Sequence, residues 1–157
     1  MKTLVKRIKS ALQADTNIST YVQAEAIQIC SSDVLPSVSV SLVPFIGVAP
    51  VSTSEMWHSS GHKDRIHNVR IFIVQNMEVQ ETAIVGDSVK KGVLEIVDDV
   101  SNAMRAKFFA SGGTNYLSKP SEITGVTYTT AAYGDNIFLF VAQVNLLCVQ
   151  QIEVTTS

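Results

Sequence analysis

The sequence has little cysteine, no long apolar segment and few charges. Only two of its 157 residues are cysteine, too few for a disulfide framework, and the apolar neighbours of Cys148 favour a buried free thiol. The longest uninterrupted apolar segment, residues 137–142, has six residues, far fewer than a membrane span needs. Basic residues at positions 6, 7 and 9 interrupt any secretory signal. We therefore expect a soluble protein that acts in a cytoplasm or in an assembly built there, with no membrane contact.

The shortage of charge limits the classes of partner. Charged residues make up 17% and apolar residues 46% of the chain, and the formal net charge is −2. A dedicated nucleic-acid-binding domain normally carries a basic patch and a basic overall balance, so this composition argues against one. The low charge content instead suggests that extra surface is buried against other chains.

Motifs for catalysis and phosphate binding are also missing. The chain has no Gly-x-Ser-x-Gly segment, and neither cysteine has a histidine in the setting of a known nucleophile. Gly112 and Gly113 follow the longest expected helix, whereas a phosphate loop precedes its helix. Asp98 and Asp99 fit a solvated helix face better than a catalytic pair. We predict that the protein is no enzyme and has no catalytic residue and no cofactor.

The strongest positive signal is a long acidic helix over residues 82–109. Apolar residues recur there every three or four positions, which makes a stripe wide enough to cover a sheet. Gly86 and Gly92 each weaken this helix by about 1 kcal/mol relative to alanine, and Asp87 offers an N-cap for a shorter helix. The stripe consists of Val85, Val89, Val93, Ile96, Val97, Val100, Met104 and Phe108.

The rest of the chain contains signals for one short helix and several strands. The pattern at residues 3–14 predicts an amphipathic helix, and the alternation of serine with apolar residues at 38–42 predicts a half-exposed strand. The nearly continuous apolar block at 69–74 is typical of a central strand. Further strands are expected at 24–30, 66–76, 123–130 and 137–150, the last two joined by a turn at 133–136.

This order of elements predicts a single α+β domain over residues 1–157. We expect two layers: a mainly antiparallel sheet of four to five strands, with one long and one short helix packed on one face. The short helix is too short to be stable alone, so it must dock on the body of the domain.

A long polar segment, residues 47–65, is expected to protrude from this domain as a loop. It exceeds the usual length of a hairpin connection, and long loops on compact domains often carry function. It contains the only tryptophan, beside a methionine, which suggests an interface anchor. The alternative is that the tryptophan folds back onto its own sheet. The candidate partner-interface residues are Met56, Trp57, His58, His62, Lys63 and Arg65.

Histidines in the same region raise the question of a metal site. His58 and His62 are four residues apart, which suits a metal only if the segment is helical. Their Ser- and Gly-rich surroundings, together with His67, favour a solvated polar loop. We therefore predict no metal site and keep a small metal-binding module, built on residues 58–67, as a less favoured alternative.

Charges of opposite sign are separated along the chain. Residues 1–10 carry four cations and no acid, and residues 76–103 carry six acids against two lysines, a net of −4. Such separation can fix the register of identical subunits placed head to tail. The alternative is intramolecular, with the first helix lying beside the long one. The candidate inter-subunit charge contacts are Lys2, Lys6, Lys9, Glu95, Asp98 and Asp99.

The order of these segments has a counterpart among viral proteins. A short helix at residues 4–12 ends in a turn at 15–18, and Pro36 then leads into a strand within 34–40. The strand at 68–74 runs into the long helix, and a terminal hairpin closes the domain. In order and patterning, the chain resembles the tail terminator, or tail completion, proteins of long-tailed bacteriophages.

The resemblance implies a structural virion protein of the tail and neck, assembled in the host cytoplasm. Such a protein forms a homohexameric ring at the head-proximal end of the tail tube, ends tube polymerisation and joins the tail to the neck. Its implied partners are its own copies, the tail tube protein and a neck or head completion protein. Genomic DNA passes through the lumen without specific binding. A head-side neck adaptor is the alternative role.

Overall fold

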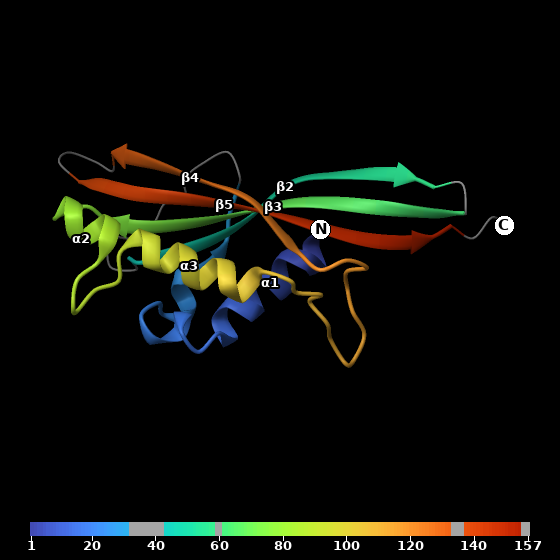
Figure 1. The fold of residues 1–157 in the computed structure, drawn as a ribbon, viewed down its shortest axis with the longest axis horizontal. Helices are drawn as coiled ribbons and strands as arrows, with labels where there is room; N and C mark the ends of the chain where they lie inside the picture. The colour runs from blue at the N-terminus through green and yellow to red at the C-terminus, as the bar shows by residue number, and fades with distance from the viewer. Residues whose placement is uncertain (32–42, 59–60, 133–136, 155–157) are drawn as a thin grey trace.

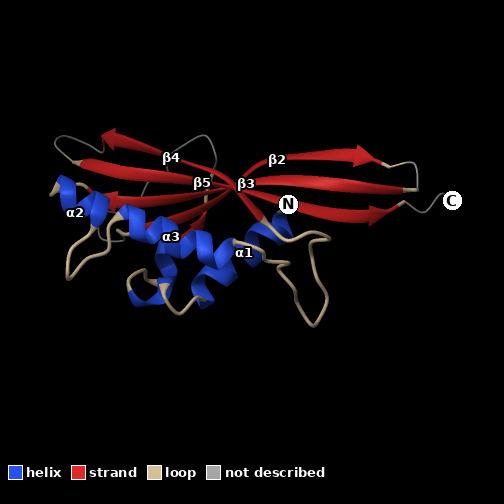
Figure 2. Ribbon diagram, in the orientation of Figure 1, coloured by secondary structure: helices blue, strands red, loops and turns tan. Residues whose placement is uncertain are grey.

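The computed structural model describes residues 1–31, 43–58, 61–132 and 137–154, which form a five-stranded sheet with helices on one side (Figures 1 and 2). This confirms the expected α+β class. The helices are α1 (Lys2–Ala14), α2 (Gln80–Val85) and α3 (Val93–Met104), with short 3-10 turns at Ile18–Thr20 and Ala24–Ala26. The strands are β1 (Ile27–Ile29), β2 (Phe45–Trp57), β3 (His62–Asn76), β4 (Glu122–Ala132) and β5 (Phe138–Glu153).

The sheet is mixed and uneven in width. Its strand order is β1-β2-β3-β5-β4, with β1 parallel to β2 and every other pair antiparallel. The short strand β1 reaches only as far as Val48 of β2, and β4 pairs with β5 only from Leu147 onward to Phe138. Three strands therefore continue alone. We call residues 51–57 of β2, 62–68 of β3 and 148–153 of β5 the arm, which extends past the helices in Figure 1.

The core lies between the inner half of the sheet and the two longer helices. Buried side chains recur on α1 and α3 at helical spacing, because each helix turns one apolar side to the sheet. They meet strand residues that share one face through the β3–β5 register, such as Ile71 opposite Val144. Fully buried members of this core include Leu4, Ile8, Leu12, Ile71, Ile73, Ile96, Val100, Met104, Val144 and Leu146.

The prediction of one long helix over residues 82–109 is wrong. α2 ends at Val85, the following Gly86 has a φ of 88°, and α3 begins only after Gly92. A Cβ on Gly92 would lie 2.3 Å from the backbone nitrogen of Gly86, so the close approach of these two segments requires glycine. Val85 and Val89 are consequently 57% and 86% exposed, whereas the members of the stripe from Val93 to Met104 are buried. The two main helices are almost equal, with 13 and 12 residues.

The expected loop at residues 47–65 is also wrong, because most of it is strand. Residues of β2 and β3 pair continuously from Ser52 opposite Asn68 to Trp57 opposite Lys63. The segment projects from the domain, but as part of the arm. All residues at 51–57 are exposed, so the apolar alternation that reveals a half-buried strand is absent there.

The remaining expectations fare better. The helix at 3–14 and the terminal hairpin of β4 and β5 are confirmed, as is the central strand, which is longer than expected. The strand at 24–30 is shorter and follows a 3-10 turn. The predicted strand at 38–42 and turn at 133–136 lie outside the described residues.

Candidate functional site

The arm contains five of the six predicted interface residues and brings three of them, Trp57, Lys63 and Arg65, onto one face. Cross-strand pairing sets Glu55 opposite Arg65 and Trp57 opposite Lys63, so these side chains share one face. Glu55 accepts hydrogen bonds from Lys63 Nζ at 2.8 Å and from Arg65 Nη2 at 2.7 Å, and these bonds lower the pKa of its carboxyl. The Lys63 ammonium lies 5.2 Å from the centre of the Trp57 ring. Ion pairs this exposed add little stability, so they mainly order the surface.

Apolar side chains on the arm are open to solvent. Val51, Met56 and Trp57 are 41%, 55% and 64% exposed. Trp57 packs beside Lys63 but does not fold back into the core, so its role as an interface anchor stays a prediction. Exposed aromatic and methionine side chains are typical of surfaces that bind other proteins.

The three histidines do not converge. His58 Nε2 lies 3.3 Å from Asp64 Oδ2, which Lys119 Nζ also approaches at 3.5 Å. His62 begins β3, and its carbonyl oxygen accepts a hydrogen bond from the His58 backbone N–H. His67 is buried, and its Nδ1 lies 2.9 Å from Thr53 Oγ1. The part of the chain that the structure describes holds no group of three or more His, Cys, Asp or Glu arranged for a metal ion, so the metal-binding alternative gains no support.

The helix layer carries the other predicted site. α1 and α3 lie side by side and run in opposite directions. Arg7, in the first half of α1, donates a hydrogen bond to the carbonyl of Phe109, which follows α3. Tyr21, which follows α1, donates one at 3.0 Å to Asp99, in the middle of α3. The start of α1 therefore lies near the end of α3.

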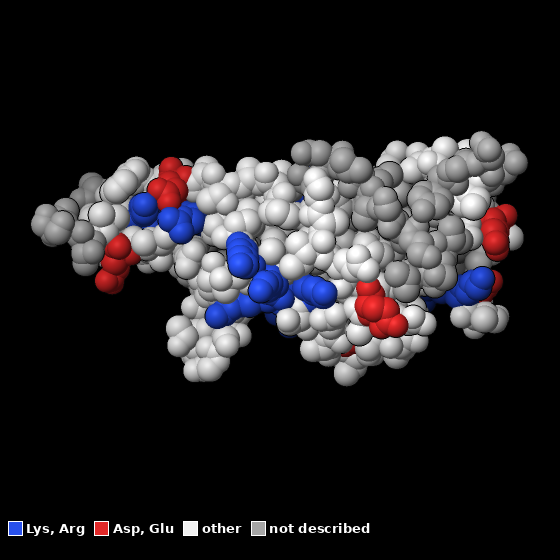
Figure 3. All heavy atoms as spheres, turned by 180° about the vertical axis from the view of Figure 1, so that it is seen from behind, with Lys and Arg blue, Asp and Glu red and all other residues white. Residues whose placement is uncertain are grey.

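Cations gather where α1 begins and α3 ends. We call this surface the basic end. None of its lysines or arginines forms an ion pair with a described residue, and Figure 3 shows blue side chains gathered near the middle of the rear face. The sequence alone did not indicate its two members from beyond α3, which only the antiparallel packing brings to α1. The basic end consists of Lys2, Lys6, Lys9, Arg105 and Lys107.

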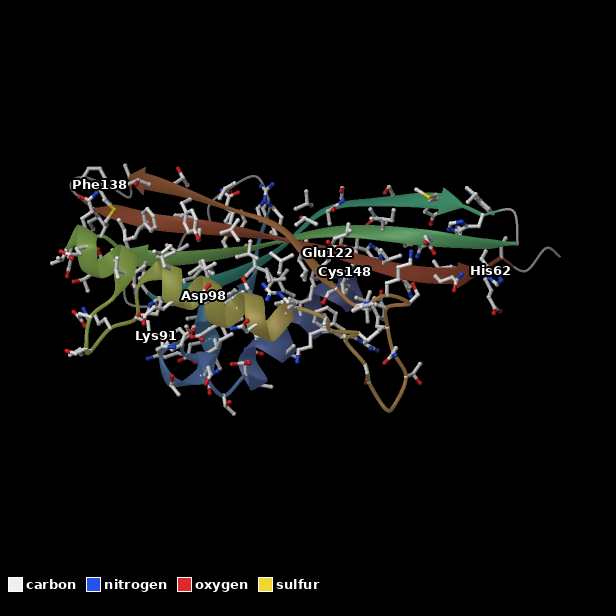
Figure 4. All side chains as sticks on the ribbon, viewed as in Figure 1. His62, Lys91, Asp98, Glu122, Phe138 and Cys148 are labelled. Carbon is white, nitrogen blue, oxygen red and sulfur yellow. The ribbon has the colours of Figure 1, made fainter. Side chains whose placement is uncertain are left out.

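The predicted acidic partners lie toward the start of α3, and we call them the acidic end: Glu95, Asp98 and Asp99. Asp99 pairs with Lys91 and accepts the Tyr21 hydroxyl; burial and this carboxylate raise the pKa of Tyr21. Glu95 accepts the backbone N–H of Gly92 at 3.1 Å and so caps the helix. Asp98, labelled in Figure 4, is exposed and has no partner among the described residues.

The structure thus places the cations where α1 begins and α3 ends, and the acids from the first turn of α3 to its middle. No ion pair between described residues joins the basic end to the acidic end. The predicted intramolecular alternative is therefore realised as packing of the helices, but not as charge pairing between these residues.

A hollow of about 850 Å³ lies where the chain leaves α2 and enters α3. It is lined by Tyr21, Gln75, Glu78 and Lys91, among others. Gln75 donates to the Lys91 carbonyl at 3.0 Å and accepts the Asn76 N–H at 3.1 Å, so its amide is satisfied within the fold. No sequence pattern predicts this hollow, because it depends on the break between the two helices.

The two cysteines are free thiols in the structure. Cys148 is fully buried, which confirms the expectation from its apolar neighbours. Burial raises the pKa of Cys148 to about 12 and that of Cys30 to about 11. Both thiols are therefore poor nucleophiles at neutral pH.

Comparison with known proteins gives no family for this arrangement. No protein-family model matches the chain, and no curated protein sequence matches it. Within the described residues, no helix is both long and apolar enough to cross a membrane.

Proposed function

We propose that this chain is a tail terminator subunit of a long-tailed bacteriophage. In this proposal six copies form a ring that caps the head-proximal end of the tail tube and offers a docking surface to the neck. The proposal combines the sequence resemblance with one structural observation, the projecting arm. The protein then acts through surfaces and catalyses no reaction.

The arm supports a role in assembly because it exposes apolar side chains and a strand edge that a partner chain could cover. It carries exposed Val51, Met56 and Trp57 on a strand whose outer side pairs with β1 only as far as Val48. No strand among the described residues pairs with this outer edge, and such an edge can add a strand or a flat surface from another chain. We assign the arm to contact with the tail tube protein or with a neighbouring copy in the ring.

The overall charge is compatible with a lumen through which DNA passes. The net charge of −2 gives no general attraction to phosphate, and such attraction would slow a moving genome. A head-side neck adaptor would use the same kind of arm, so the two roles differ in the partner that the arm binds.

Native mass spectrometry over a concentration series tests the ring directly. We expect a hexamer of the 17.0 kDa chain that weakens as salt is added. Co-sedimentation with purified tail tubes or with DNA-filled capsids then separates terminator from neck adaptor. A chain that stays monomeric at all concentrations and sediments with neither particle would contradict both roles.

Trp57→Ala tests the arm. We expect tube binding to weaken about 30-fold, the effect of losing an anchor worth ~2 kcal/mol. Phe138→Ala is the matched control, because Phe138 is 51% exposed and lies at the end of β5 away from the arm (Figure 4). Equal tube binding by both variants and the unchanged chain would rule out Trp57 as an anchor of the arm on the tube.

A further inference from the structure

We infer that the basic end of one copy docks on the acidic end of the next copy. This inference rests on the proposed ring and names the contact that closes it. Lys6 and Lys9 of one subunit would face Asp98 of its neighbour, and the same contact would repeat around the ring.

The start of α1 carries the wrong charge for its own helix. The N-terminus of a helix is the positive end of its dipole and favours acidic side chains. The first turn of α1 has no acid, and Lys2 and Lys6 lie there or one turn later. Local stability therefore does not explain these lysines, whereas a partner of opposite charge does.

Four of the cations elsewhere in the described chain form ion pairs with acids, whereas Arg70 bonds to Asn145 and Lys90 has no such pair. Lys63 and Arg65 pair with Glu55, and Lys91 pairs with Asp99. The five residues of the basic end have no acidic partner in the described part of the chain. Five cations without an acidic partner among the described residues thus share one surface, whereas Arg70 and Lys90 lie singly elsewhere.

The complementary surface is present on the same chain. Asp98 is exposed on α3 and unpaired among described residues, on the half of the helix away from Arg105 and Lys107. Two different surfaces of opposite charge on one subunit make a head-to-tail contact, and such contacts close into rings when the rotation allows it. A contact between two identical basic ends would instead place like charges together.

Charge reversal tests the contact. We expect Lys6→Glu and Asp98→Lys each to raise the concentration needed for half assembly about tenfold or more, because each places like charges across the contact. Matched controls are Lys90→Glu and Glu122→Lys, which reverse exposed charges outside the two ends and leave the contact intact. All four positions are exposed, so no variant should destabilise the monomer in thermal unfolding, and Lys6→Glu should stabilise it slightly because it places an acid near the start of α1.

Mixing the two reversed chains gives the decisive result. In an alternating ring, Glu at position 6 of one chain meets Lys at position 98 of the next, and the following contact has the original charges. The mixture should therefore assemble at the concentration of the unchanged chain, although neither variant does so alone. Rescue by mixing is specific to a contact between these two surfaces.

Three results would overturn the inference. A ring that forms equally well with either reversal leaves the proposed function standing but removes this contact. Loss of binding to a labelled DNA duplex on Lys6→Glu, with ring assembly unchanged, would assign the basic end to nucleic acid. Failure of the unchanged chain to assemble at low salt would remove the ring itself, and this contact with it.

Discussion

The two halves of β2 differ completely in their exposure to solvent. Residues 45–49 are all buried, and residues 51–57 are all exposed. The change falls at Pro50 and a bulge, where the register with β3 shifts between Pro50 and Ser52. A bulge bends and twists a strand, so it re-aims the outer half relative to the inner half.

This difference indicates that the two halves have separate roles. The inner half consists of Phe, Ile, Val, Gly and Ala and holds the core together, whereas the outer half is rich in Ser and Thr and has no helix over it. Backbone pairing, together with surface side-chain contacts such as those of Glu55, carries the arm outward from a stable base. The inner sheet therefore determines folding, and the arm can vary in sequence to suit a partner.

Ile71→Ala should have the largest effect on stability. Ile71 is fully buried in the inner half of β3, and deleting such a side chain costs about 2–5 kcal/mol through lost burial and a cavity. Val51→Ala in the arm is the matched comparison, and an exposed position should change stability by less than about 0.5 kcal/mol. Urea denaturation measures both. Similar losses for the two variants would mean that the arm contributes to the core.

Gly86→Ala should have the next largest effect. A Cβ there would lie 2.6 Å from the Gly92 backbone nitrogen, and φ is already 88°. We expect a loss larger than the roughly 1–2 kcal/mol that a left-handed conformation alone costs. Gly61→Ala separates the two causes, since Gly61 has φ 77° with nothing within 4 Å of a Cβ. If both variants lose equal stability in urea, the close approach of residues 86 and 92 is unimportant.

The sequence predicted the elements that have a periodic apolar pattern. It did not predict the features that depend on contacts between segments distant in the chain. The apolar spacing of α1 and of α3 from Val93 onward gave the helix layer, and the hairpin of β4 and β5 followed from its turn residues and flanking apolar blocks. The helix break was missed because Val85 and Val89 continue the spacing by coincidence, although both are exposed. Gly86 and Gly92 were noted as weak points of a helix, and their actual role is a backbone-to-backbone approach.

The candidate surfaces were predicted in part for the same reason. The arm residues were identified from composition, but their arrangement depends on strand pairing that small polar residues do not reveal. The lysines of α1 were identified, whereas Arg105 and Lys107 join them only because α1 and α3 run antiparallel. The local sequence pattern does not predict the relative direction of two packed helices.

The smallest expected effect is a dependence of folding stability on pH, and it should arise at the boundary between the arm and the inner sheet. His67 is buried there, and burial, together with the positive charge of the N-terminus, lowers its pKa below the ordinary 6.5. Well above pH 6.5 the imidazole is neutral in both the folded and the unfolded state. As pH falls below 6.5 the unfolded chain takes up the proton first, so stability should fall until the folded-state pKa is reached.

His67→Gln isolates this effect from the other two histidines, which stay in place. We expect the unfolding free energy of the variant to fall less between pH 7 and pH 5 than that of the unchanged chain, whatever its value at pH 7. The slope of stability against pH, from urea titrations at each pH, is therefore the quantity to compare. Equal slopes would mean that His67 can be protonated without opening the base of the arm. A shallower slope for the variant would mean that folding stability depends on the junction between the arm and the inner sheet, where His67 is buried, rather than on the exposed part of the arm.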